Sequence, residues 1–221
     1  MNTIDALHSR HTCRAFKPDP VKKETVLKVI EAATRAPSWA NTQPWEIYVA
    51  AGEVLERLRQ AYLKNSQEGM AAHPDLPRPQ SWPLALQKRT EDLMARRSQL
   101  LGIARENSAG RKTLTQANYK FFGAPAVIYL CMDRSLTPWS VFDLGSLSQS
   151  IMLAARDNSL DTAVAVMLVA FPDLIRAHME IPDDLSIIIG IALGYNDPNS
   201  PENRFRSPRR SLSDVVRLKG F

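Results

Sequence analysis

The sequence predicts one α+β domain in which helices cover both faces of a sheet. Its 221 residues, 44% of them hydrophobic, are enough to build one substantial core. Helical spacing of apolar residues alternates along the chain with short, β-branched apolar runs. One helical segment, 138–158, is apolar almost all round and therefore has to be buried on several sides. These three observations together indicate helices layered on a sheet.

The first third of the chain is expected to be mostly helical. Residues 22–36 place Val26, Leu27, Val29, Ile30 and Ala33 at helical spacing, and the prolines at 37 and 44 prevent that helix from continuing. In order, we expect a short helix and a basic segment within 1–20, a helix over 22–36, a loop over 37–44, a strand over 46–51 and a helix over 53–65.

A proline-rich stretch over 66–84 predicts a long loop, and loops of this length are usually functional or mobile. Basic helices should follow over 86–118, with a break near Gly110. Strand 126–132 precedes a helix that Thr137 and Pro138 open as N-cap and first helical residue. The remaining expected elements are strands over 162–171 and 186–195, an amphipathic helix over 172–180 and a turn over 196–201.

The charge and cysteine content restrict the function classes. A net charge of +5 and a pI of about 9.4 favour anionic ligands, either a phosphorylated cofactor or nucleic acid. Cys13 and Cys131 form no CxxC pair, so they predict neither a disulfide nor a metal site, and they suit a reducing compartment. Without a secretion signal or an apolar run long enough to span a bilayer, the chain is expected to be cytoplasmic and not to bind membranes.

Several common catalytic motifs are missing from the sequence. There is no GxGxxG or GxxxxGK[ST] phosphate loop, no HExxH and no GxSxG nucleophile turn. His8, His11 and Cys13 lie close in sequence but lack a matching fourth ligand, so no metal site is expected. A phosphate site would therefore be built from side-chain cations.

Three polar segments are candidates for such a site. Arg10-His11-Thr12-x-Arg14 can clamp a phosphate, although an exposed basic segment would have the same composition. The loop 37–45 places Ser, Asn and Gln between prolines, which suits an aromatic heterocycle but also an ordinary polar turn. The arginine-rich tail 203–210 fits a second set of phosphate cations, a solvated tail or a nucleic-acid patch.

Six motifs, in order, make the chain resemble the nitroreductase family. Each is weak by itself, but together they cover nearly the whole chain, and residues 99–125 look closest to the nitrobenzoate-reductase-like branch. The motifs are Arg10-His11-Thr12-x-Arg14, Pro37-Ser38-x-x-Asn41-x-Gln43-Pro44-Trp45, Phe121-Phe122-Gly123-Ala124-Pro125-Ala126-Val127-Ile128, Asp143-x-Gly145-x-x-x-Gln149-x-x-x-Leu153-Ala154-Ala155, Gly190-Ile191-Ala192-Leu193-Gly194-Tyr195 and Asn203-Arg204-Phe205-Arg206-Ser207-x-Arg209.

The resemblance implies an α+β sandwich around a mixed, mostly antiparallel sheet, forming a single domain over 1–221. It also implies a homodimer with a domain-swapped C-terminal arm and two FMN sites at the subunit interface. NADH or NADPH would be the electron donor, and a small molecule would be the acceptor. Nucleic acid is not expected as a partner, and no metal is implied.

The resemblance further implies roles by matched position. Arg10 and Arg209, with Arg206 as a further candidate, would hold the FMN phosphate. His11 and Thr12 would line the ribityl chain, and Arg14 would lie near flavin N1 and O2. Pro37, Ser38 and Asn41 would come from the partner subunit, and Trp39 and Asp143 belong to the same expected cofactor site. The segment Val164, Ala165, Val166 and Met167 would present a backbone N–H to flavin N5. No side chain is expected to act as an acid or base.

Two positions depart from the family pattern. Many relatives have Glu-Gly or Pro-Gln-Ala next to N5, where this chain has Val164–Met167. The familiar Gln-Asn pair of the central helix is Gln149-Ser150 here. A backbone donor tolerates the first change, whereas the preference for a substrate or nicotinamide cofactor can shift with it.

We therefore expect an FMN-dependent NAD(P)H oxidoreductase that reduces nitroaromatic or quinone-type acceptors by ping-pong hydride transfer, with the loop at 66–84 shaping the acceptor pocket. Two alternatives stay open. One is a different flavin reaction on the same fold, such as dehalogenation or flavin breakdown. The other is a basic nucleic-acid-binding module, although aromatic residues do not interleave with the basic runs as a stacking surface requires.

Overall fold

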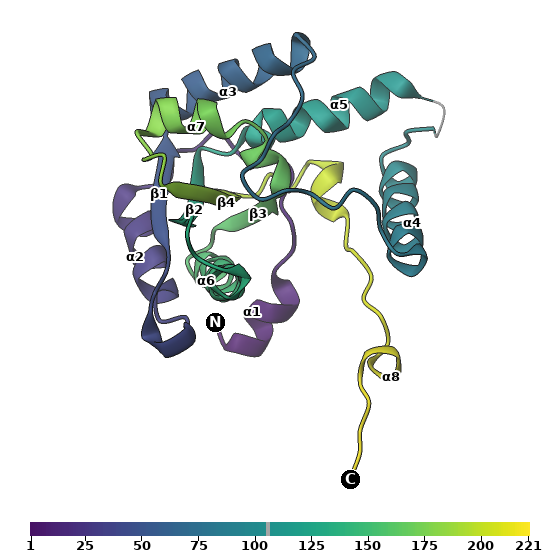
Figure 1. Ribbon diagram of the computed structural model, residues 1–221. Helices are drawn as coiled ribbons and strands as arrows, with labels where there is room; N and C mark the ends of the chain where they lie inside the picture. The colour runs from purple at the N-terminus through teal and green to yellow at the C-terminus, as the bar shows by residue number, and fades with distance from the viewer. Residues whose placement is uncertain (105–106) are drawn as a thin grey trace.

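A four-stranded antiparallel sheet lies between two layers of helices in the computed structural model, which describes residues 1–104 and 107–221 (Figure 1). The strands are β1 (Glu46–Ala51), β2 (Ala126–Asp133), β3 (Asp161–Ala165) and β4 (Leu185–Gly194), in the order β1-β2-β4-β3. A parallel bridge between Thr12 and Thr162 lays the N-terminal segment beside β3. The predicted α+β architecture with helices on both faces is confirmed.

The two helical layers follow from alternation along the central strands. Successive side chains of a strand point to opposite faces, so Val127 and Tyr129 of β2 enter one core while Ile128 and Leu130 enter the other. One face carries α3 (Gly52–Gln67), α5 (Ser108–Tyr119) and α7 (Pro172–Met179); the other carries α2 (Lys23–Ala33) and α6 (Pro138–Asp157), with α1 (Thr3–Ser9) beside α6 (Figure 1).

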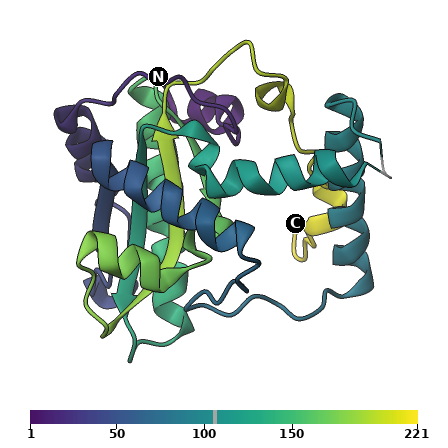
Figure 2. The same cartoon turned by 90° about the horizontal axis from the view of Figure 1, so that it is seen from above.

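Helix α4 (Leu84–Leu100) stands apart from the sheet, at the end of the long loop that leaves α3 (Figure 2). After β4 the chain forms a short 3-10 helix, η4 (Pro201–Arg204). An extended, exposed C-terminal segment with one further turn, α8 (Leu212–Val215), follows. No helix among residues 1–104 and 107–221 is both long enough and apolar enough to cross a membrane.

Most predicted elements are confirmed to within about three residues at each end, but the expected strand over 162–171 is wrong beyond Ala165. There the chain turns into a 3-10 helix, η3 (Val166–Val169). The Tyr62 hydroxyl donates to the Leu168 carbonyl oxygen at 2.9 Å and lies 3.4 Å from the Phe171 backbone nitrogen. The apolar run is thus buried as predicted, but an apolar run does not distinguish a strand from a buried turn.

The predicted helix break near Gly110 is also wrong. The break lies between α4 and α5, where Gly102 has a φ of 65° and ends α4, and Ile103 N–H bonds to Ser98 O at 2.9 Å. Gly110 instead lies inside the first turn of α5 and donates to the Asn107 side chain at 2.8 Å. Arg105 and Glu106 belong to the stretch 99–125 that resembles the nitrobenzoate-reductase-like branch, and they lie outside the described residues. Helix α6 begins at Pro138 as predicted, although the Thr137 side chain makes no capping bond.

The proline-rich loop is fixed at its middle by Asp75. Its carboxylate accepts from Arg176 Nη2 at 2.6 Å, from Ile187 N at 2.8 Å and from Arg134 Nη2 at 3.3 Å. Burial raises the pKa of Asp75, but these hydrogen bonds outweigh burial and hold the pKa below its ordinary value. The loop therefore has one firm attachment to the sheet.

Gly194 at the end of β4 provides a test of the packing. A Cβ atom there would lie 2.5 Å from Pro125 Cδ and 2.9 Å from Pro125 Cγ. We expect Gly194→Ala to lower the free energy of unfolding by about 1–3 kcal/mol, because overpacking strains a dense core. Pro125→Ala removes both atoms, so urea unfolding of the double variant should show less destabilisation than the two single variants added together. Strict additivity would contradict this packing.

Candidate functional site

Two arginines from opposite ends of the chain, Arg10 and Arg209, lie near enough for the charge of one to act on the other. Arg10 follows α1, and its Nη1 atom lies 4.0 Å from Met152 Sδ on α6. The pKa of Arg10 is lowered first by burial and then by the nearby charge of Arg209. Within the part of the chain that the structure describes, neither arginine pairs with a carboxylate. Two neighbouring cations without a counter-charge are suited to binding an anion.

His11 lies beside this pair and is 7% exposed. Its Nδ1 atom is 3.2 Å from the Ser9 carbonyl oxygen, so Nδ1 carries the proton, and Nε2 lies 3.5 Å from the Asn196 amide. Burial, helped by the charge of Arg206, lowers the pKa of His11 below its ordinary value. The ring is therefore neutral at pH 7 and acts as a hydrogen-bonding group.

Asn203 joins the N-terminal segment to the segment after β4. Its Oδ1 accepts from Arg14 N at 2.7 Å and from Ala15 N at 3.2 Å, and its Nδ2 donates to Ala15 O and to Asn196 Oδ1, each at 2.7 Å. This buried amide was quoted in a sequence motif but given no role. Only its position in the Asn-Arg-Phe-Arg motif could have indicated one.

An ion pair fixes α4 to the same region. Arg97 Nη2 lies 2.8 Å from Glu202 Oε2 and 3.0 Å from Oε1, while Nε lies 3.1 Å from Oε2. The two side chains are only 11% and 16% exposed. The pKa of Arg14 is lowered by burial and by the Arg97 charge, so this pair adjoins Arg14. Sequence reasoning missed it, because no periodicity links two positions 105 residues apart.

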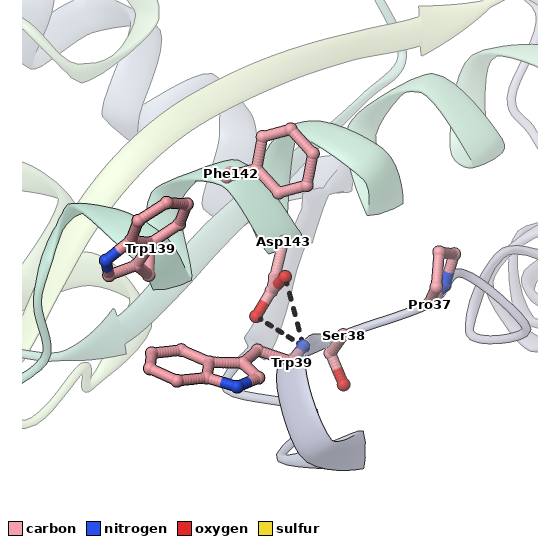
Figure 3. A pocket seen from close by; sticks show the side chains of 6 residues that line it. All are labelled: Pro37, Ser38, Trp39, Trp139, Phe142 and Asp143. Atoms are coloured by element: carbon pink, nitrogen blue, oxygen red, sulfur yellow. Dashed lines mark hydrogen bonds between the residues drawn. The ribbon is translucent and has the colours of Figure 1, made fainter.

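The predicted loop at 37–44 forms a second group of candidate site residues together with the start of α6. Pro37, Ser38 and Trp39 line a hollow of about 410 Å³ together with Trp139, Phe142 and Asp143 of α6 (Figure 3). Trp39 and Trp139 meet edge to face with ring centroids 6.0 Å apart. Asn41 is exposed at the loop's tip with a φ of 56°. The sequence indicated neither Trp139 nor Phe142 as a site residue, only that the helix over 138–158 is apolar almost all round.

Asp143 attaches this loop to α6. It is 4% exposed, and its carboxylate oxygens lie 3.2 and 3.3 Å from the Trp39 backbone nitrogen, as the dashed lines in Figure 3 show. Ser38 Oγ accepts from Gln43 N at 2.9 Å and closes the loop on itself. The structure thus gives Asp143 and the Ser38 hydroxyl a role in shaping the loop.

The expected site residues form two groups that do not meet within one chain. Arg10 contacts α6 at Met152, whereas the loop contacts α6 at Asp143. Nine residues of helix separate these points, a distance of roughly 14 Å along the axis. The cluster of Arg10, His11, Arg206 and Arg209 is therefore distinct from the group of Pro37, Ser38, Trp39 and Asp143.

The segment Val164–Met167 crosses the end of β3. Val164 and Ala165 pair with Ile191 and Gly190, and Val166 begins the turn with 46% of its surface exposed. The parallel bridge at Thr12 makes the N-terminal segment run beside β3 in the same direction. Arg78 of the long loop approaches Met167, with Nη1 3.5 Å from Sδ. This contact brings the loop to the exposed turn.

Nucleophilic cysteine chemistry does not fit the structure. Burial raises the pKa of Cys13 and of Cys131 to about 12, so both thiols stay protonated at neutral pH. Across the described residues, no three His, Cys, Asp or Glu side chains gather as metal ligands would. What the site offers is cations, a neutral imidazole and backbone N–H groups.

The Asp143 contact generates a prediction about the loop. We expect Asp143→Ala to speed amide hydrogen exchange over residues 38–45, because a hydrogen bond to a buried charged acceptor contributes about 1.5–3 kcal/mol. Asp143→Asn keeps an acceptor oxygen and should have a smaller effect. Exchange in α3 serves as the internal control. Unchanged exchange over 38–45 in the alanine variant would show that the carboxylate does not hold the loop.

Comparison with known proteins gives consistent matches along the whole chain. The profile described as the nitroreductase family matches residues 7–195. A 4-nitrobenzoate reductase from Pseudomonas putida is 33% identical over 213 residues, which cover 96% of this chain and 93% of that protein. The crystal structure of an FMN and NADPH-dependent nitroreductase NfnB from Sphigopyxis sp. strain HMH matches with a TM-score of 0.95 at 30% identity and covers all of both chains. The FMN-dependent nitroreductase NfnB from Mycobacterium smegmatis, solved in complex with NADPH, matches with a TM-score of 0.92 at 30% identity, covering 99% of this chain and 100% of that one.

Proposed function

The chain belongs to the nitroreductase family, and from this membership we propose that it is an FMN-dependent oxidoreductase that takes electrons from NADPH or NADH and reduces nitroaromatic compounds. The observation that carries the proposal is the pair of uncompensated cations, Arg10 and Arg209, in a chain that matches FMN-dependent nitroreductases over its full length. Quinones are proposed as further acceptors.

The residues of this structure fit FMN. Its phosphate carries a charge of about −1.5 to −2 at pH 7, which Arg10 and Arg209 can balance. Arg206 lies close enough for its charge to lower the pKa of His11, so it is available as a third cation. The neutral His11 ring and Thr12 suit the polyol of the ribityl chain, because hydroxyl groups need hydrogen bonds rather than charge.

Bound FMN would supply the two-electron redox chemistry. The chain's own part is to bind and orient. The side chain of Asn203 fixes the backbone of Arg14. Arg14 would then place a cation near N1 and O2 of the flavin ring. The exposed turn at Val164–Met167 would offer a backbone N–H to N5. We propose that donor and acceptor occupy one cleft in turn, in a ping-pong sequence that needs no side-chain acid or base.

We further propose an isologous homodimer with composite sites. The two groups of expected cofactor residues lie roughly 14 Å apart along α6, so a second copy has to bring the loop of one chain to the arginines of the other. Trp39, Trp139 and Phe142 are 65–71% exposed around the start of α6, an apolar surface that a second copy would cover. The extended arm, with Leu212 and Leu218 about 70% or more exposed, would pack on the partner in the same way.

The first prediction from this proposal concerns cofactor content. The purified protein should be yellow, with about one FMN per chain, and should oxidise NADPH in the presence of 4-nitrobenzoate. Arg10→Ala with Arg209→Ala should lower FMN occupancy, whereas Arg57→Ala on the exposed surface of α3 should not. A colourless protein that cannot be reconstituted with FMN would rule out the function.

The second prediction concerns the composite site. One variant carries Arg10→Ala, and another carries Ser38→Phe and Asn41→Phe, so each homodimer has two damaged sites. In a mixed dimer, one site collects all the defects and the other none. Random mixing after co-refolding should therefore restore about one quarter of wild-type activity. If mixed dimers form without recovery, all these residues serve one chain's own site.

A further inference from the structure

A second cationic hollow lies between α4 and the C-terminal segment. Its volume is about 590 Å³, within the range of small-ligand sites. Arg89 and Arg96 of α4 face it from one side, and Arg209 and Arg210 face it from the other. Asp92 is the one carboxylate in its lining. Four guanidinium groups against one carboxylate leave a positive excess even when Arg209 also holds the FMN phosphate, and this excess favours a ligand with several negative charges.

The positions on α4 explain how this wall forms. Residues 86, 89, 93 and 96 are spaced three and four apart, so Leu86, Arg89, Leu93 and Arg96 lie along one side of the helix. The stripe combines two cations with two apolar side chains, and Trp82 adds an aromatic ring just before the helix. Within the described residues, neither Arg89 nor Arg96 has an ion-pair or hydrogen-bond partner. Both remain available to an external ligand.

The two walls are held in place by a buried contact. The Arg97–Glu202 ion pair joins α4 to η4 immediately before the C-terminal wall, with both side chains mostly buried. A buried, doubly hydrogen-bonded pair of this kind fixes geometry, because either charge alone would be strongly disfavoured there. The pair thus fixes α4 beside η4, and the C-terminal wall begins at Ser207, shortly after η4.

The hollow also adjoins the expected flavin residues. Arg209 lines it and lies close enough to Arg10 for its charge to lower the pKa of Arg10. Arg97, next to Arg96 on α4, pairs with Glu202, and the neighbouring Asn203 accepts a hydrogen bond from Arg14 N at 2.7 Å. A ligand that extends away from the flavin site on this side would therefore enter the hollow.

We propose that the hollow binds the adenosine 2′-phosphate end of NADPH and that Arg89 and Arg96 make the enzyme prefer NADPH to NADH. This inference rests on the proposed function. The planar forks of arginine match phosphate oxygens, and Trp82 with the two leucines offers an apolar surface for adenine. A nitroaromatic carboxylate would use only one of the four cations. NADH lacks only the 2′-phosphate, so it would lose the contacts to Arg89 and Arg96.

The experiment measures nucleotide binding on the FMN-loaded protein by isothermal titration calorimetry, with 2′,5′-ADP and 5′-AMP as probes. Wild type should bind 2′,5′-ADP about tenfold more tightly than 5′-AMP or better. Arg89→Gln with Arg96→Gln should abolish that preference. The same variant should raise the KM for NADPH about tenfold while changing the KM for NADH less than about twofold.

A matched control removes two exposed cations elsewhere. Arg57→Gln with Lys64→Gln on α3 makes the same change in net charge and should leave both probes and both KM values unchanged. Trp82→Ala should weaken 2′,5′-ADP and 5′-AMP alike, because adenine is common to both. FMN content, read from the visible spectrum, is measured for each variant to show that the flavin site is intact.

Three results would overturn the inference: equal binding of the two probes to wild type, a preference retained in the Arg89/Arg96 variant, or an unchanged affinity after Trp82→Ala. Failure of the proposed function looks different. In that case the protein takes up no FMN and does not oxidise NADPH, and calorimetry on the protein as purified still reports whether the hollow selects the 2′-phosphate.

Discussion

The Asn203 side-chain amide is the contact on which the cationic site depends. A buried amide can make up to four hydrogen bonds, and this one bonds to the backbone at Arg14 and Ala15 on one side and to Asn196 and Asp197 on the other. It therefore sets the distance between the first twenty residues and the segment that follows β4. Arg10, Arg14, Arg206 and Arg209 are all within seven residues of this junction or its partners. A shift at Asn203 would move all of these cations together.

Helix α6 relates the two groups of site residues to one another. Asp143 attaches the 37–44 loop near its start, and Met152 receives Arg10 near its end. Because a helix is a rigid spacer of about 1.5 Å per residue, the separation of the two groups is fixed by sequence distance. The strong burial of Leu147 and Ile151 against the sheet keeps that spacer in place. In the proposed homodimer, each subunit would therefore contribute one half-site near each end of this helix.

Local sequence patterns predicted the helices and strands well. Features that depend on contacts between residues far apart in the sequence were not predictable from those patterns. The apolar runs in residues 126–132 and 186–195 and the helical spacing in 22–36 are properties of neighbouring residues, so the sequence displays them. The end of β3 at Ala165 depends instead on the Tyr62 hydroxyl, and the break after α4 depends on the positive φ of Gly102. For the site, the motifs named residues that the structure places in two groups, one around Arg10 and one around Asp143. The Arg97–Glu202 pair and the Trp139 contact join positions with no shared pattern, and only the fold shows them.

The tether at Asp75 divides the long loop, residues 68–83, into two shorter ones. The entropic cost of closing a loop grows with the logarithm of its length, and the tether replaces one long loop between α3 and α4 by two short ones with fewer conformations. The second segment carries Arg78 to Met167 and then leads into α4. Insertions or deletions in this second segment would change the part of the loop that contacts the turn after Ala165. The Asp75 contact to Ile187 would still hold the first segment against the sheet. Asp75 thereby separates the segment before it from the segment after it, which carries Arg78 to the exposed turn.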